Sequence, residues 1–106
     1  SENSCSAKKA EHINHVWTYD FINDQTEDGR SLKFLTILDE YTRESPAIEV
    51  GRSMRSEDVI ETLEYLFSVR GVPGYIRSDN GPEFIADSIK EWLKSMNVKT
   101  LYIEKG

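Results

Sequence analysis

The sequence has a single cysteine, no long apolar run and no excess of basic charge. One cysteine, Cys5, excludes an intramolecular disulfide and disfavours a cysteine-based zinc site. No apolar run approaches the roughly 18 residues that a membrane helix needs. The polar start, "SENSCSAKKAEHINH", contains no hydrophobic region of the kind found in signal peptides. We therefore expect a reducing cytoplasmic location and no membrane partner.

Acidic residues outnumber basic ones, 19 to 13, so that the formal net charge is −6. This balance counts against a simple nucleic-acid-binding module, which usually presents a basic face. It does not exclude an enzyme that meets phosphates through divalent cations, because such a site must itself be acidic. The hydrophobic fraction of 38% and the length of 106 residues are typical of one soluble domain with a modest core.

The hydrophobic pattern divides the chain into a polar lead followed by strands and helices. Residues 1–14 lack a period and are predicted to be a flexible lead. Alternating or continuous apolar character predicts strands over 15–22, 31–39, 46–51, 75–79 and 98–103. Helical spacing of apolar residues predicts helices over 53–71 and 86–97.

The signals between these segments refine the predicted order β-β-β-α-β-α-β. Asp28-Gly29 is a hairpin signal within the turn over 23–30. The nearly continuous apolar run 31–39 suits a central strand buried on both faces. Ser56 is a plausible N-cap, and Gly71 a plausible end, of the first helix. The first three strands should form an antiparallel meander, and the later two should add in parallel through right-handed crossovers. The expected domain is α/β, with a mixed five-stranded sheet in two or three layers.

Two aspartates stand out from this pattern. Asp20 interrupts an aromatic strand, where an ionised carboxylate is costly unless it is paired or bound to a metal. Asp79 ends the strand "YIRSD", and sites in α/β sheets form where strands end. If their strands are neighbours, the two carboxylates can converge on Mg²⁺ or Mn²⁺. The simpler interpretation of Asp79 is turn chemistry before Asn80-Gly81.

The other polar and aromatic candidates have structural interpretations. Asp39 and Glu40 are expected to start the turn after the second strand, and His12 and His15 to lie on the surface. Four acidic residues of the first predicted helix are expected to be solvated: Glu57, Asp58, Glu61 and Glu64. The pairs Trp17/Tyr19 and Trp92/Leu93 are expected to pack in the core.

Four segments resemble the catalytic core of the retroviral-integrase superfamily, and more closely the OrfB-type DDE transposases of bacterial insertion sequences. They are "HVWTYDF" around Asp20, "LTILDEYTRE", "SDNGPEF" around Asp79, and the closing "LYIEKG". The resemblance extends from about residue 11 to the end. It implies an RNase H-like fold, with residues 15–106 as an incomplete core.

The resemblance also implies an Asp-Asp-Glu site for metal-dependent DNA integration and recombination. Asp20 and Asp79 match the two aspartates, which hold Mg²⁺ or Mn²⁺ while a DNA 3′-hydroxyl attacks a phosphodiester. Asn80 and Gly81 match the turn that shapes the loop beside the site. The implied partners are DNA, as element ends and as target, and further copies of the protein. The implied location is the bacterial cytoplasm, at the nucleoid during transposition.

The sequence departs from the family pattern at the third carboxylate. The family's glutamate lies farther beyond the second aspartate than this chain extends, and Glu83 and Glu104 do not have its spacing. We therefore expect a fragment of a longer transposase that is inactive alone and binds metal weakly. The residues that contact DNA are not identified by any motif.

Two alternatives remain open at this point. One is another RNase H-like nuclease, such as a ribonuclease or a junction resolvase, which the position of the third carboxylate would distinguish. The other is a non-catalytic, DNA-associated assembly domain. The presence of both Asp20 and Asp79 counts against decay of a catalytic site.

Overall fold

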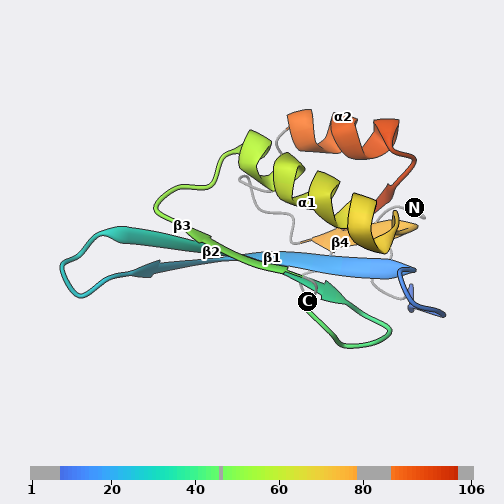
Figure 1. Cartoon of the computed structure of the whole chain (residues 1–106), viewed down its shortest axis with the longest axis horizontal. Helices are drawn as coiled ribbons and strands as arrows, with labels where there is room; N and C mark the ends of the chain where they lie inside the picture. The colour runs from blue at the N-terminus through green and yellow to red at the C-terminus, as the bar shows by residue number, and fades with distance from the viewer. Residues whose placement is uncertain (1–7, 46, 79–86, 103–106) are drawn as a thin grey trace.

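A computed structural model of the chain describes residues 8–45, 47–78 and 87–102 (Figure 1). The strands are β1 (Val16–Gln25), β2 (Ser31–Asp39), β3 (Ala47–Gly51), β4 (Tyr75–Ser78) and β5 (Lys99–Tyr102). The helices are α1 (Ser56–Arg70) and α2 (Asp87–Ser95). The predicted element order β-β-β-α-β-α-β is confirmed.

The five strands form one mixed sheet in the order β3-β2-β1-β4-β5. β1 pairs with β2, and β2 with β3, in antiparallel fashion, while β1–β4 and β4–β5 are parallel. Helix α1 lies in the connection from β3 to β4, and α2 in the connection from β4 to its parallel neighbour β5. β1 and β4 are therefore neighbours, which is the condition that the two-aspartate hypothesis needs.

The β1–β2 hairpin is longer than the sequence pattern predicts. β1 continues to Gln25, three residues past the predicted end, and projects beyond the helices (Figure 1). The ladder to β2 continues to the pair Gln25–Ser31, so that backbone hydrogen bonds hold this exposed segment without buried side chains. Gly29 supplies the positive φ, 85°, in the turn that closes the hairpin.

Both helices cover the same face of the sheet (Figure 1). The core lies between them and that face, and it includes Trp17, Leu35 and Leu63, none of which is solvent-exposed. Trp92 packs against the core, and Tyr19 and Leu93 lie within it, as predicted.

The prediction that β2 is buried on both faces was wrong. Its residues alternate, with Leu35, Ile37 and Asp39 buried and Phe34, Thr36 and Leu38 only half-buried. The reason is that no helix of the described residues covers the second face, which we call the open face.

The N-cap of helix α1 lies one residue before its predicted position, Ser56. Arg55 is the N-cap, and its backbone N–H donates to the Asp58 carboxylate at 2.9 Å, so Ser56 is the first helical residue. The end is as predicted, because Gly71 has φ 96° and its N–H donates to the Phe67 carbonyl at 3.0 Å. Neither helix is long and apolar enough to cross a membrane, within the residues that the structure describes.

Candidate active site

Asp20 lies on the open face of the sheet. Alternation along β1 places Trp17, Tyr19 and Phe21 toward the helices and Thr18, Asp20 and Ile22 on the opposite side. Asp20 is exposed, so an ionised carboxylate at this position does not carry the cost of burial that its aromatic neighbours in the sequence suggest. The aromatic side chains that surround it in the sequence point to the other face, which leaves its carboxylate accessible to a ligand from solvent.

The parallel register of β1 and β4 ends immediately before the two aspartates. Thr18 pairs with Arg77, and Tyr19 with Ser78, while Asp20 and Asp79 are the residues that follow these in the sequence. Asp79, Asn80 and Gly81 lie outside the described residues, so their roles stay predictions. The structure shows that the residues before the two aspartates, Tyr19 and Ser78, pair in register on adjacent parallel strands.

A buried contact on the covered face holds this register. Tyr19 and Ser78 are 3% and 1% exposed, and a hydrogen bond joins their side chains. Burial raises the pKa of Tyr19 to about 12; the hydrogen bond with Ser78 opposes this rise, and the nearby Tyr102 adds to it. The neutral phenol is therefore strongly favoured in the folded protein.

The raised pKa of Tyr19 predicts a loss of stability in alkali. Because the pKa is about 12 in the folded state and 10.0 in the unfolded state, the unfolded state loses its proton first. The contribution is complete below pH 10 and disappears as the pH rises through 12, with about 1.4 kcal/mol lost at pH 11. Denaturant unfolding at pH 8 and pH 11 should show this loss in the wild type. Between these two pH values, the free energy of unfolding of the variant Tyr19→Phe should fall by about 1.4 kcal/mol less than that of the wild type. An equal fall in both proteins would contradict the assignment.

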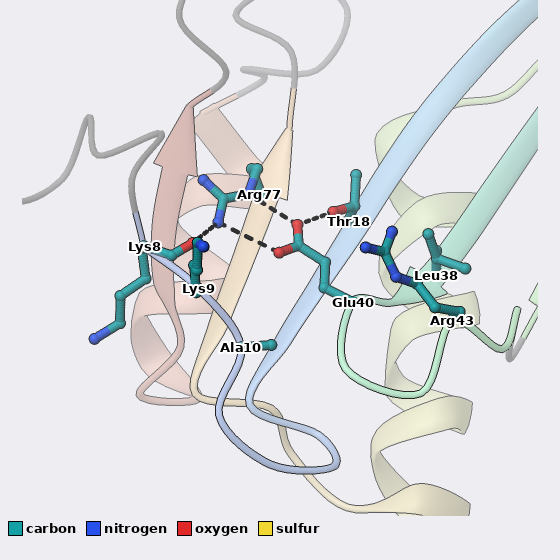
Figure 2. Close-up of a pocket in the computed structure, with 8 residues that line it drawn as sticks. All are labelled: Lys8, Lys9, Ala10, Thr18, Leu38, Glu40, Arg43 and Arg77. Atoms are coloured by element: carbon teal, nitrogen blue, oxygen red, sulfur yellow. Dashed lines mark hydrogen bonds and ion pairs between the residues drawn. The ribbon is translucent and has the colours of Figure 1, made fainter.

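An ion-pair network on the open face joins three elements of the fold (Figure 2). The Arg77 Nε donates to Glu40 Oε2 at 2.8 Å and its Nη2 to Oε1 at 3.3 Å. Thr18 donates its hydroxyl to the same Glu40 carboxylate. The Arg77 and Glu40 side chains are only 10% and 20% exposed. The network therefore links β1, β4 and the turn after β2. Its β1 member, Thr18, lies two residues before Asp20.

The segment before β1 contacts the same side of the sheet. Arg77 also donates to the Lys8 carbonyl, and the Lys8 ammonium lies 4.7 Å from the centroid of the Tyr75 ring. Asp39, buried as the last residue of β2, accepts hydrogen bonds from the backbone N–H groups of Asn14 and Tyr41, both at 2.9 Å. Asp39 thus starts the turn, as predicted, and its hydrogen bond from Asn14 also fixes the segment before β1.

His15 was expected on the surface, but it is 8% exposed. Its Nδ1 accepts from the Glu11 N–H at 2.9 Å, and its ring stacks on His12 at 4.4 Å. Its ring also meets the Tyr75 ring edge-on at 5.4 Å, which accounts for its burial. His12 is exposed, as expected.

A pocket of about 470 Å³ opens beside the ion-pair network (Figure 2). Among the residues that the structure describes, its lining combines four basic side chains with one carboxylate: Lys8, Lys9, Arg43, Arg77 and Glu40, together with Ala10, Thr18 and Leu38. This local excess of positive charge contrasts with the net charge of −6 for the whole chain.

Sequence reasoning missed Arg77, Glu40 and Arg43. The sequence pattern indicates only a turn at Glu40 and only a short apolar strand around Arg77. An available signal was the arginine itself, because a charge inside a short buried strand requires a partner of opposite charge. Which acidic residue supplies that partner was not evident, since Glu40 and Arg77 lie 37 positions apart in the sequence.

The described residues fit a divalent cation only in part. Asp20 supplies an exposed carboxylate, the type of oxygen ligand that Mg²⁺ and Mn²⁺ prefer. Among residues 8–45, 47–78 and 87–102, no three histidine, cysteine, aspartate or glutamate side chains gather closely enough to hold a metal. A set of three such ligands around a cation at Asp20 would therefore need residues outside these ranges.

Comparison with known proteins gives a consistent family assignment. The model of the integrase core domain family matches residues 10–106. The chain is 34% identical over 93 residues to an uncharacterized 39.2 kDa protein of insertion element IS476 from Xanthomonas euvesicatoria. It is 33% identical over 93 residues to an uncharacterized 31.7 kDa protein of insertion element IS407 from Burkholderia multivorans. Each match covers 88% of this chain but only 27% and 34% of the relatives, respectively.

Solved structures of low sequence identity share the fold. A chain of a simian T-cell lymphotropic virus intasome, in complex with a PP2A regulatory subunit, has a TM-score of 0.78 at 16% identity over 95% of this chain and 41% of that one. The HTLV-2 integrase catalytic core domain, solved with magnesium in a dimeric form, has a TM-score of 0.72 at 21% identity over 85% of this chain and 61% of that one. The family match, the insertion-element relatives and the RNase H-like sheet agree, and the chain belongs to the integrase core domain family.

Proposed function

We propose that this chain is part of the catalytic core of a DNA transposase that performs metal-dependent phosphodiester cleavage and strand transfer. The observation that carries the proposal is the parallel pairing of β1 and β4, in register up to the residues before Asp20 and Asp79. The similarity to insertion-element proteins favours transposition over other RNase H-like chemistry.

Asp20 and Asp79 would hold Mg²⁺ or Mn²⁺, and Asn80 and Gly81 would shape the adjoining loop. Such a cation, when bound, lowers the pKa of an attacking hydroxyl and stabilises the oxygen that leaves the phosphorus. The sheet's contribution is rigidity, because a hydrogen-bonded pair of strands fixes the separation of Tyr19 and Ser78, the residues that precede the two aspartates. A third carboxylate, a glutamate outside this chain, would complete the site, so we expect the chain alone to be inactive.

The proposed partners are DNA, as element ends and target, and further copies of the protein. One solved relative is described as an intasome, and the HTLV-2 core domain was solved in dimeric and trimeric forms. The proposed setting is the bacterial cytoplasm, with the protein at the nucleoid when it acts.

The activity is tested with the longer protein that carries the complete site. Incubated with element-end DNA, it should join 3′ ends to a target duplex in Mg²⁺ or Mn²⁺ and should form no product in EDTA. Products that form equally well in EDTA, or cleavage of RNA rather than DNA, would reject the proposal.

Metal binding by this chain is a separate prediction. Because two carboxylates make a weak site, we expect Mn²⁺ to bind with a dissociation constant on the order of 1 mM. Paramagnetic broadening of amide NMR signals should be centred on Asp20 and its strand neighbours Tyr19 and Ser78. The variant Asp20→Asn should remove that broadening, whereas Asp24→Asn on the same face of β1 should not. Broadening centred on the acidic residues of α1 would contradict the assignment.

A further inference from the structure

We propose that the pocket between the N-terminal lead and the turn after β2 binds a backbone phosphate of the DNA strand that lies along the open face. Arg43 and Lys9 would be the principal contacts. This inference rests on the proposed function, because it places a second DNA contact beside the proposed catalytic carboxylates.

The charges of the pocket identify an anion as its ligand. Glu40 is already neutralised by Arg77 at 2.8 Å, and the Lys8 ammonium lies over the Tyr75 ring. No hydrogen bond or ion pair joins the side chain of Arg43 or Lys9 to any residue that the structure describes. Among the described residues, two cations without partners therefore line the pocket, and the acidic group beside them, Glu40, is already paired.

The backbone of Arg43 supports a binding role. Arg43 has φ 67°, a left-handed conformation that arginine adopts only at an energetic cost. Its N–H donates to the Asp39 carbonyl at 2.8 Å, which holds the turn in this form. The side chain consequently lines the pocket (Figure 2). A glycine would satisfy the same turn without strain, so packing of the turn does not explain the arginine.

The position of the pocket favours a phosphate of a nucleic-acid strand over a free anion. Thr18 lines the pocket, and Asp20 follows it on the same face, two residues along β1. Two strand residues span roughly 6.7 Å. That distance is close to the rise of about two nucleotides along a B-form helix. A strand with one phosphate near Asp20 would thus bring a phosphate about two nucleotides away to the pocket that Arg43 lines. The planar guanidinium of Arg43 suits bidentate contact with phosphate oxygens.

The test measures DNA binding by this chain without metal, using fluorescence anisotropy of a labelled duplex in EDTA at several salt concentrations. Arg43→Gln should weaken binding about tenfold near 0.1 M salt and lower the log–log salt slope by about 0.9. Lys9→Gln should act in the same direction. Arg52→Gln removes the same charge at the far end of β3 and should change affinity less than about twofold.

The variant Arg43→Gly separates binding from folding. It relieves the positive φ, so the melting temperature should stay the same or rise while DNA affinity falls as it does in Arg43→Gln. Equal weakening on element-end and unrelated duplexes is expected for a phosphate contact. The proposal is overturned if the wild-type chain shows no salt-dependent DNA binding, or if Arg43→Gln binds as the wild type does or loses no more affinity than Arg52→Gln.

Failure of this inference is distinguishable from failure of the proposed function. Asp20→Asn should not weaken binding in EDTA, because no metal is present for that carboxylate to hold. If strand transfer is never observed but binding still depends on Arg43, the phosphate pocket stands and the catalytic assignment falls. The reverse result, transfer without dependence of binding on Arg43, rejects the pocket alone.

Discussion

Replacing Asp20 by asparagine is expected to lower the rate of strand transfer by about 10³-fold or more in the longer protein that carries the complete site. The amide keeps the size of the side chain but removes the negative charge that would hold the cation. Loss of one anionic ligand removes several kcal/mol of transition-state stabilisation, and about 4 kcal/mol corresponds to that factor. Since Asp20 is exposed, the fold should be unaffected. Single-turnover strand-transfer assays in Mg²⁺ provide the measurement.

The matched control for Asp20→Asn lies on the same strand. Asp24 also projects from the open face of β1, four residues farther along, and is likewise exposed. Asp24→Asn makes the same chemical change without touching the proposed site, so it should retain activity within about twofold. If both variants lose activity equally, the effect is a general one of charge. If Asp20→Asn keeps wild-type activity, Asp20 is not a metal ligand.

Removing the guanidinium of Arg77 is expected to destabilise the fold by about 3 kcal/mol, because it leaves the Glu40 carboxylate without its counter-charge at a mostly buried position. The Glu40 side chain is 20% exposed, which places the cost at the lower end of the range for buried pairs. The Lys8 carbonyl also loses a donor. For a domain of this size the melting temperature of Arg77→Met should fall by roughly 12 °C or more.

Two further variants show whether this cost comes from the pair. The double variant Arg77→Met/Glu40→Leu should recover much of the lost stability, because no unpaired charge remains. Arg30 and Asp28 form a comparable pair at 3.3 Å, but their side chains are 66% and 61% exposed. Arg30→Met should therefore cost less than about 1 kcal/mol. A double variant no more stable than Arg77→Met would show that the arginine acts through packing of its stem instead.

The sequence pattern predicted the elements well because the two periodicities are distinct along most of the chain. Trp17, Tyr19 and Phe21 alternate along β1, while Val59, Leu63 and Leu66 follow the helical spacing of α1. The errors fell where local pattern does not decide the outcome. β1 extends to Gln25 through cross-strand hydrogen bonds, and β2 is buried only on the face that both helices cover.

The sequence by itself determined the element order and the family, and it singled out Asp20 and Asp79 as the candidate pair. These follow from residue types and short spacings, which a linear chain displays directly. Only the tertiary structure decided that Asp20 is exposed on an open face and that β1 lies beside β4 in register. It also revealed the pairing of Glu40 with Arg77 and the position of Arg43 beside them. Such contacts join residues far apart in the chain, and they form only when packing of the sheet brings those residues together.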